Sequence, residues 1–69
     1  MKRYVTFGQN HIHNIDGKLL DCNCVAVIQG DRHTIFEIFG PKWCMEYTEE
    51  EFDKGNLEMS YFPRGLIEV

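Results

Sequence analysis

Two pairs of potential metal ligands lie close together in the first half of the chain. The first pair is His11 and His13, and the second is Cys22 and Cys24. Side chains two residues apart on a β-strand point to the same face of the sheet. Histidine nitrogens and cysteine thiolates are the ligands that zinc prefers in closed tetrahedral sites. The spacing therefore predicts a structural zinc site formed by His11, His13, Cys22 and Cys24.

Whether these side chains can meet depends on the register of the two strands that carry them. A two-residue turn at Asp16-Gly17 matches the type I′ preference of β-hairpins, and it places His13 opposite Leu20. His13 and Cys24 are then four residues apart along the ribbon, which is roughly 13 Å at ~3.4 Å per residue. One zinc ion cannot bind all four side chains across that distance.

A turn at Gly17-Lys18 removes this difficulty, and glycine at its first central position matches the type II′ preference. In this register His13 faces Cys22. His11 faces Cys24, and the four positions form a quadrilateral of about 5 Å by 7 Å that tetrahedral ligation can close. The zinc hypothesis therefore predicts the Gly17-Lys18 turn, unless another residue replaces one of the four. Two residues are candidates for such a replacement: Cys44 and His33.

Two other interpretations of these residues stay open. The cysteines can be small core residues, with the histidines as polar groups at strand ends. Cys22 and Cys24 can also be a redox pair, although a disulfide between them would be strained and lacks a thioredoxin-like context. Full ligation of zinc by protein leaves no position for water, so the metal would be structural and we expect no enzymatic activity.

Length and composition indicate one domain that spans residues 1–69. So short a chain buries only about 60% of its unfolded surface and often needs a metal, disulfides or a partner. The 43% apolar content nevertheless argues for a packed core. We expect no membrane span, because no apolar run approaches the ~20 residues required. An odd number of cysteines does not suit a disulfide framework, and it indicates reduced thiols in a cytoplasm.

The net charge of −4 lies entirely in residues 41–69, which hold seven acidic and three basic side chains. Direct binding to nucleic acid requires a basic surface, so we expect none. An acidic surface suits a basic protein partner instead. The predicted partner-binding residues are Glu49, Glu50, Glu51 and Asp53. The alternative is a solvated helix face that only aids solubility.

Strands are predicted from strand-forming residues and from apolar alternation. Residues 2–13 and 19–29 are the first two, and the Asp16-Gly17-Lys18 segment joins them as an N-terminal hairpin. The remaining predicted strands are residues 42–47, residues 57–61 and a short edge strand at residues 66–69.

Helix-capping signals predict two short helices. Asp31 is a suitable N-cap for a helix at residues 32–39, which Gly40-Pro41 ends. The segment from Thr48 to Glu51 matches a capping box, and it begins a helix of about two turns that ends at Gly55-Asn56. Together the elements predict an α+β fold, in which a small antiparallel sheet in the order ββαβαβ carries one or two short helices.

Five segments of the chain form a pattern: FGQNHIH at residues 7–13, DCNCVAVI at 21–28, IFEIFG at 35–40, EYTEE at 46–50 and FPRG at 62–65. These segments resemble a group of small phage and prophage proteins. The group has the pattern FGQxHxH, CVAVI, FG, YTEE and FPRG, and it is similar to a zinc-containing anti-CRISPR protein that blocks Cas9. A lysine is common at the position of Cys22 in this pattern, which weakens Cys22 as a ligand.

The resemblance implies a non-enzymatic inhibitor that a phage makes in the host cytoplasm. Its target would be a host CRISPR effector of the Cas9 type, whose nucleic-acid channel is positively charged. The acidic surface would bind a basic lobe of the effector and prevent target DNA from loading. The alternative is a phage accessory or interaction protein without a defence target. The sequence leaves open whether the chain is a monomer or a small homo-oligomer.

Overall fold

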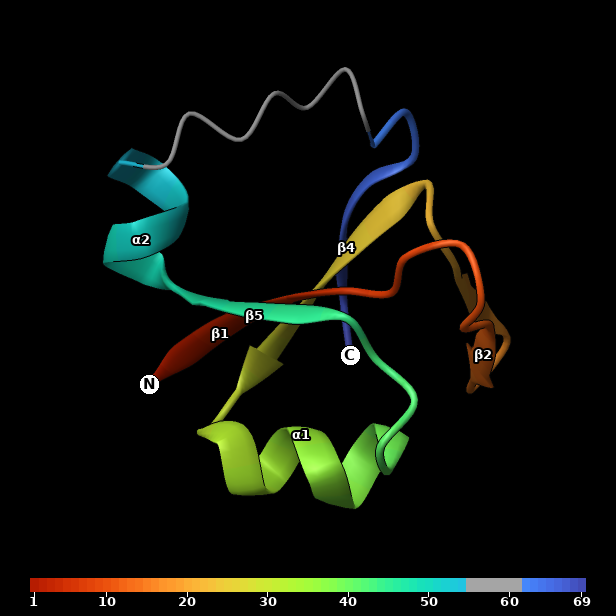
Figure 1. The fold of residues 1–69 in the computed structure, drawn as a ribbon, viewed down its shortest axis with the longest axis horizontal. Coiled ribbons are helices and arrows are strands. Elements are labelled where there is room, and N and C mark those ends of the chain that lie inside the picture. The colour runs from red at the N-terminus through yellow and green to blue at the C-terminus, as the bar shows by residue number, and fades with distance from the viewer. Residues whose placement is uncertain (55–61) are drawn as a thin grey trace.

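The computed structural model describes residues 1–54 and 62–69 of the chain. Within these residues it contains a mixed four-stranded sheet, a separate two-stranded ribbon and two helices (Figure 1). The elements in chain order are β1 (Lys2–Thr6), β2 (His13–Ile15), β3 (Lys18–Leu20), β4 (Cys24–Gln29), α1 (Arg32–Phe39), β5 (Met45–Thr48), α2 (Glu49–Lys54) and β6 (Gly65–Glu68). The predicted α+β class is confirmed.

The main sheet has the strand order β5-β1-β4-β6. β1 runs antiparallel to both β4 and β5, whereas β6 runs parallel to β4, with Ala26 opposite Ile67. The sheet is therefore mixed and not wholly antiparallel as the sequence suggested. A parallel pair needs a long crossover connection. The chain between β4 and β6, which includes α1, β5 and α2, supplies one.

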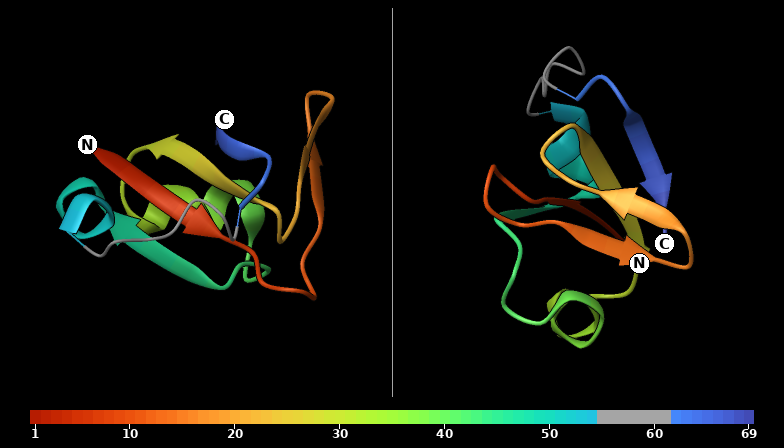
Figure 2. Two further views of the ribbon diagram at one scale, coloured as in Figure 1. Left: turned by 90° about the horizontal axis from the view of Figure 1, so that it is seen from above. Right: turned by 90° about the vertical axis from the view of Figure 1, so that its right-hand side faces the viewer.

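The N-terminal half differs from the predicted single hairpin. The predicted strand at residues 2–13 is divided into β1 and β2, because residues 8–10 form a turn in which Gly8 has a φ of +64°. The predicted strand at residues 19–29 is divided into β3 and β4 by a turn at residues 21–23. Among the residues that the structure describes, β2 and β3 pair only with each other, and Figure 2 shows this ribbon standing beside the main sheet.

Hydrophobic clusters cover both faces of the main sheet. The larger cluster, on the side of α1, consists of Val5, Phe7, Leu20, Cys24, Ala26, Ile28, Ile35 and Phe39. The other consists of Tyr4, Val25 and Val27, against which Tyr47, Phe52 and Phe62 pack. Because apolar groups cover both faces, every residue from Cys24 to Ile28 is buried. This burial explains why the segment CVAVI is apolar at every position.

Both helices begin as predicted. Asp31 caps α1, and the Thr34 N–H donates to its carboxylate. Thr48 and Glu51 form the predicted capping box of α2: the Thr48 N–H donates to Glu51 Oε1 at 2.9 Å, and the Glu51 N–H donates to Thr48 Oγ1 at 3.0 Å. Neither helix in the described part of the chain is long and apolar enough to cross a membrane.

Two predicted strands near the C-terminus have different outcomes. The edge strand predicted at residues 66–69 is confirmed as β6, one residue earlier. The strand predicted at residues 57–61 lies outside the described residues.

Candidate functional site

The β2–β3 turn decides whether the predicted zinc site can form. It is centred on Asp16-Gly17, whose φ angles are +51° and +81°, and it pairs His13 with Leu20. Both central residues of a type I′ turn have positive φ, which aspartate and glycine tolerate best. The predicted Gly17-Lys18 turn was therefore wrong, and His13 lies opposite Leu20 and not opposite Cys22.

His13 is occupied by contacts within the fold. Its ring packs against Phe39, with 4.8 Å between ring centroids, and against Phe7 at 5.5 Å. Its Nε2 lies 2.6 Å from the carbonyl oxygen of Lys42. This histidine therefore joins the ribbon to the core and to the segment after α1.

The two cysteines of the predicted site differ in their surroundings. Cys24 is fully buried, and its Sγ lies 3.4 Å from the N–H and 3.5 Å from the carbonyl oxygen of Asp21. Burial raises the pKa of the Cys24 thiol, which opposes the thiolate form that binds metals. Cys22 is exposed in the adjoining turn, and its Sγ donates to Asn23 Oδ1. The predicted CxC pair therefore points one thiol inward and the other to solvent.

His11 lines a pocket together with a different cysteine. It lies with Cys44 and Trp43 in a pocket of about 360 Å³ that the turn at residues 8–10 borders. Cys44 was one of the two replacement ligands considered from the sequence. The other, His33, lies elsewhere, with its Nε2 2.8 Å from Glu37 Oε1 on the surface of α1.

The predicted four-residue zinc site does not fit this arrangement. Across residues 1–54 and 62–69, no group of three or more His, Cys, Asp and Glu side chains is placed to hold a metal ion. The set was predicted from the spacing along two continuous strands, and turns at residues 8–10 and 21–23 interrupt both of them. Zinc binding by the chain, and its ligation by His11, His13, Cys22 and Cys24, stay predictions.

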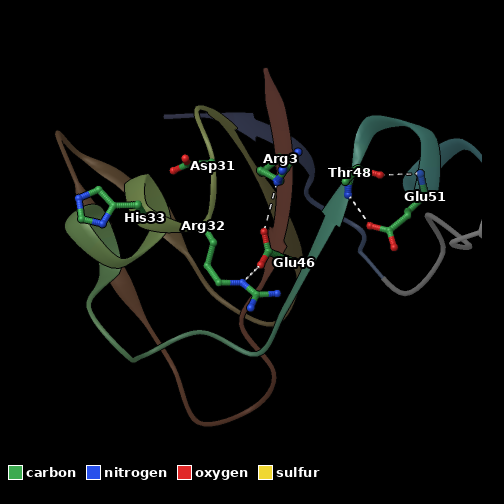
Figure 3. A pocket seen from close by; sticks show the side chains of 7 residues that line it. All are labelled: Arg3, Asp31, Arg32, His33, Glu46, Thr48 and Glu51. Carbon is green, nitrogen blue, oxygen red and sulfur yellow. Dashed lines mark hydrogen bonds and ion pairs between the residues drawn. The ribbon is translucent and has the colours of Figure 1, made fainter.

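A second pocket, of about 460 Å³, lies between α1, β5 and the start of α2 (Figure 3). We call it the charged pocket, and its lining residues are Arg3, Asp31, Arg32, His33, Glu46, Thr48 and Glu51. No local sequence pattern indicates this pocket. Arg3, Arg32 and Glu46 are far apart in the chain, and only the pairing of β5 with β1 and the position of α1 bring them together.

Glu46 is bound by two arginines in this pocket. Arg3 Nε lies 3.3 Å from Glu46 Oε2, and Arg32 Nε donates to Glu46 Oε1. The side chains of Arg3 and Glu46 are 15% and 13% exposed, whereas that of Arg32 is 70% exposed. Arg3 and Glu46 therefore form a mostly buried pair within the sheet, and Arg32 reaches it from the solvent side.

The two capping carboxylates complete the walls of the charged pocket. Hydrogen bonding from the Thr34 N–H is the main cause that lowers the pKa of Asp31 below its ordinary value of 3.8. For Glu51, the Thr48 N–H lowers the pKa below the ordinary 4.5, and the charge of Arg3 adds a smaller lowering. Both carboxylates are therefore ionised at neutral pH, and the pocket contains three negative and two positive side chains besides His33.

The predicted partner-binding residues lie on α2. Glu49, Glu50 and Glu51 are exposed in its first turn. Glu51 has a structural role as well, because its carboxylate is part of the capping box. The side chain of Asp53 lies outside the part of the chain that the structure describes. The acidic surface is thus defined by Glu49, Glu50 and Glu51, and it continues into the charged pocket through Glu51.

Comparison with known proteins assigns neither pocket: no family model, no curated protein and no solved structure matches the chain. The chemistry of the charged pocket consists of carboxylates and guanidinium groups joined by ion pairs and capping hydrogen bonds. Such groups are suited to recognising a charged partner.

Proposed function

We propose that the chain is a non-enzymatic inhibitor of a host CRISPR effector of the Cas9 type. It binds a basic lobe of the effector and prevents target DNA from loading. The observation that carries this proposal is the acidic surface on α2, where three consecutive glutamates are exposed in the first turn. The resemblance of five sequence segments to small phage proteins and to a Cas9-blocking inhibitor supports it.

The charges provide the physical argument. Cas9-type effectors hold the guide–target duplex in a positively charged channel. A compact chain with a net charge of −4, concentrated in its second half, is attracted to such a surface and competes there with DNA phosphates. The principal-axis extents of 28 × 24 × 18 Å make the chain comparable in width to a nucleic-acid duplex. Steric and electrostatic competition need no catalytic group.

Zinc is not required for this proposal. The inhibitor acts through its surface, and the described fold is held by two hydrophobic clusters and a mixed sheet. A metal bound by another arrangement of ligands would add stability without changing the face that contacts the effector.

The test is a DNA-cleavage assay with a purified Cas9-type effector and its guide RNA. The variant Glu49→Lys/Glu50→Lys reverses two charges of the acidic surface and leaves Glu51 in place, because Glu51 caps α2. We expect this variant to lose inhibition about ten-fold or more, as attraction to a basic surface becomes repulsion. The matched control, Glu37→Lys/Glu68→Lys, changes the net charge equally at exposed positions elsewhere and should keep most of the inhibition.

Two outcomes would count against the proposal. If both double variants inhibit as well as the unaltered chain, the acidic surface is not the contact. If the unaltered chain neither inhibits cleavage nor captures the effector in a pull-down, the chain is instead a phage accessory protein without this target.

A further inference from the structure

The two arginines on Glu46 differ in how firmly they are held. Arg3 comes from the central strand β1, and its ion pair with Glu46 is mostly buried between β1 and β5. Arg32 comes from the first turn of α1, and its side chain is 70% exposed. Exposed ion pairs contribute little to stability, since water screens them and ordering the side chain costs entropy. Arg32 is therefore the exchangeable partner of Glu46.

The charge balance of the pocket depends on Arg32. Arg3 and Arg32 face three carboxylates, those of Asp31, Glu46 and Glu51. If Arg32 turns out to solvent, Arg3 balances one of them and two negative charges are left over. Asp31 and Glu51 accept hydrogen bonds in the helix caps, but a carboxylate has about four lone-pair positions and can accept more. The pocket without Arg32 is thus suited to a cation.

The contact between Arg32 and Glu46 indicates which kind of cation fits the charged pocket. A guanidinium group already lies in the charged pocket against Glu46 Oε1 (Figure 3). Its planar fork of donors can contact two carboxylate oxygens together, which the compact ammonium of lysine cannot do. The pocket also adjoins the acidic surface, because Glu51 belongs to both.

We propose that the charged pocket receives an arginine side chain of the basic partner, which replaces Arg32 on the Glu46 carboxylate. This inference rests on the proposed function for the partner being basic, and it adds the chemistry of one contact. In the free protein the Arg32 side chain occupies this position on Glu46, and in the complex it turns out to solvent. Asp31 and Glu51 line the same pocket and add to its negative potential.

Binding of octa-arginine and octa-lysine peptides tests the proposal without the effector. Isothermal titration gives the affinity, and amide NMR shifts locate the site. We expect the unaltered chain to bind octa-arginine more tightly than octa-lysine, with the largest shifts at Asp31, Glu46 and Thr48. Arg32→Ala should tighten octa-arginine binding about two- to five-fold, the range of an exposed ion pair that no longer has to be broken.

Charge-matched variants separate this contact from general attraction. Lys42→Ala removes a positive charge from an exposed position outside the pocket, so it should tighten the binding of both peptides equally and less than Arg32→Ala does. Glu46→Gln should remove the preference for arginine, whereas Glu37→Gln should keep it. Glu46→Gln leaves Arg3 without its ion-pair partner, so the folding of the Glu46→Gln variant must be checked. If the Glu46→Gln variant unfolds, Arg32→Ala alone tests the proposal.

The proposal is overturned if the unaltered chain binds both peptides equally, or if Arg32→Ala and Lys42→Ala have the same effect. Its failure is distinguishable from failure of the proposed function. Arg32→Ala can also be tested in the cleavage assay. If reversing the charges of Glu49 and Glu50 weakens inhibition but Arg32→Ala leaves it unchanged, the inhibitor function is retained and the arginine site is rejected.

Discussion

The guanidinium of Arg64 donates from Nη1 to Asp21 Oδ1 at 3.3 Å, and this contact joins two turns that are 43 residues apart in the chain. The same oxygen accepts a hydrogen bond from the Asn23 N–H, and the Arg64 N–H donates to the Asn23 carbonyl oxygen. These contacts lie where β4 and β6 begin, so they join the starts of the two parallel strands. The FPRG segment therefore has a structural role beside any functional one.

Arg64→Ala should destabilise the fold by about 0.5–1 kcal/mol, the usual range for a partly exposed ion pair. The backbone contact to Asn23 remains in this variant, which limits the loss. Urea unfolding measures the change. Arg64→Lys keeps the charge and should recover part of the stability. If Arg64→Ala unfolds at the same urea concentration as the unaltered chain, Asp21 and Arg64 do not stabilise the β4–β6 register.

Neighbouring residues on α1 should respond very differently to truncation. Ile35 is fully buried in the larger cluster, and Ile35→Ala should cost about 2–5 kcal/mol, a large share of the stability of so small a domain. Phe36 is 48% exposed and has an edge contact with Trp43, so Phe36→Ala should cost only about 1 kcal/mol. Equal losses measured by thermal unfolding would show that α1 packs with another face.

Stability should fall with acid through the two helix caps. The folded-state pKa values of Asp31 and Glu51 lie below the ordinary 3.8 and 4.5, so each stabilises the fold fully above its ordinary value. That stabilisation is lost as the pH falls through the lowered folded-state pKa. Urea unfolding from pH 7 to pH 2 should show this decline, and Asp31→Asn/Glu51→Gln should make the curve flatter below pH 4.5. If the double variant and the unaltered chain lose stability over the same pH range, the two helix caps do not cause the loss of stability in acid.

Alkylation should separate the three cysteines. Cys22 and Cys44 are exposed, whereas Cys24 is buried and its thiol has a raised pKa. We expect iodoacetamide to modify two cysteines of the folded chain and all three in denaturant, as mass spectrometry can count. Zinc bound by Cys22 and Cys24 would protect both thiols from alkylation. If Cys22 is protected and a chelator abolishes that protection, the described arrangement is contradicted and the predicted zinc site is supported.

The β2–β3 turn can be tested at Gly17, whose φ is +81° and whose surroundings leave room for a methyl group. Gly17→Ala should therefore destabilise through backbone strain alone, by about 1–2 kcal/mol. D-alanine at this position, introduced by chemical synthesis, should restore the stability because it favours positive φ. A stable L-alanine variant would indicate a different turn and would reopen the register with His13 opposite Cys22.

Local signals predicted some elements well. Asp31 and the Thr48–Glu51 capping box located the starts of both helices, because caps depend on residues only three apart. The apolar run at Cys24–Ile28 predicted a buried strand, and β4 is one. Such features need no knowledge of distant partners.

Other features depend on contacts that the sequence does not display. Gly8 interrupts the first predicted strand, and no local pattern in residues 2–13 displays that break. The Asp16-Gly17 turn, in contrast, was one of the two turns that the residue types allowed. The arrangement predicted for the four zinc ligands required the other register. The charged pocket needs the β1–β5 pairing to bring Arg3 to Glu46, and local spacing cannot show it.

The order in which DNA and the chain are added to the effector tests the central claim most directly. The chain is added to the guide-loaded effector either before or after target DNA has bound, and cleavage is then started with Mg²⁺. We predict strong inhibition when the chain is added first and little when DNA is already loaded, because the acidic surface competes for the basic lobe that DNA occupies. Equal inhibition in both orders, or none in either, would contradict the account.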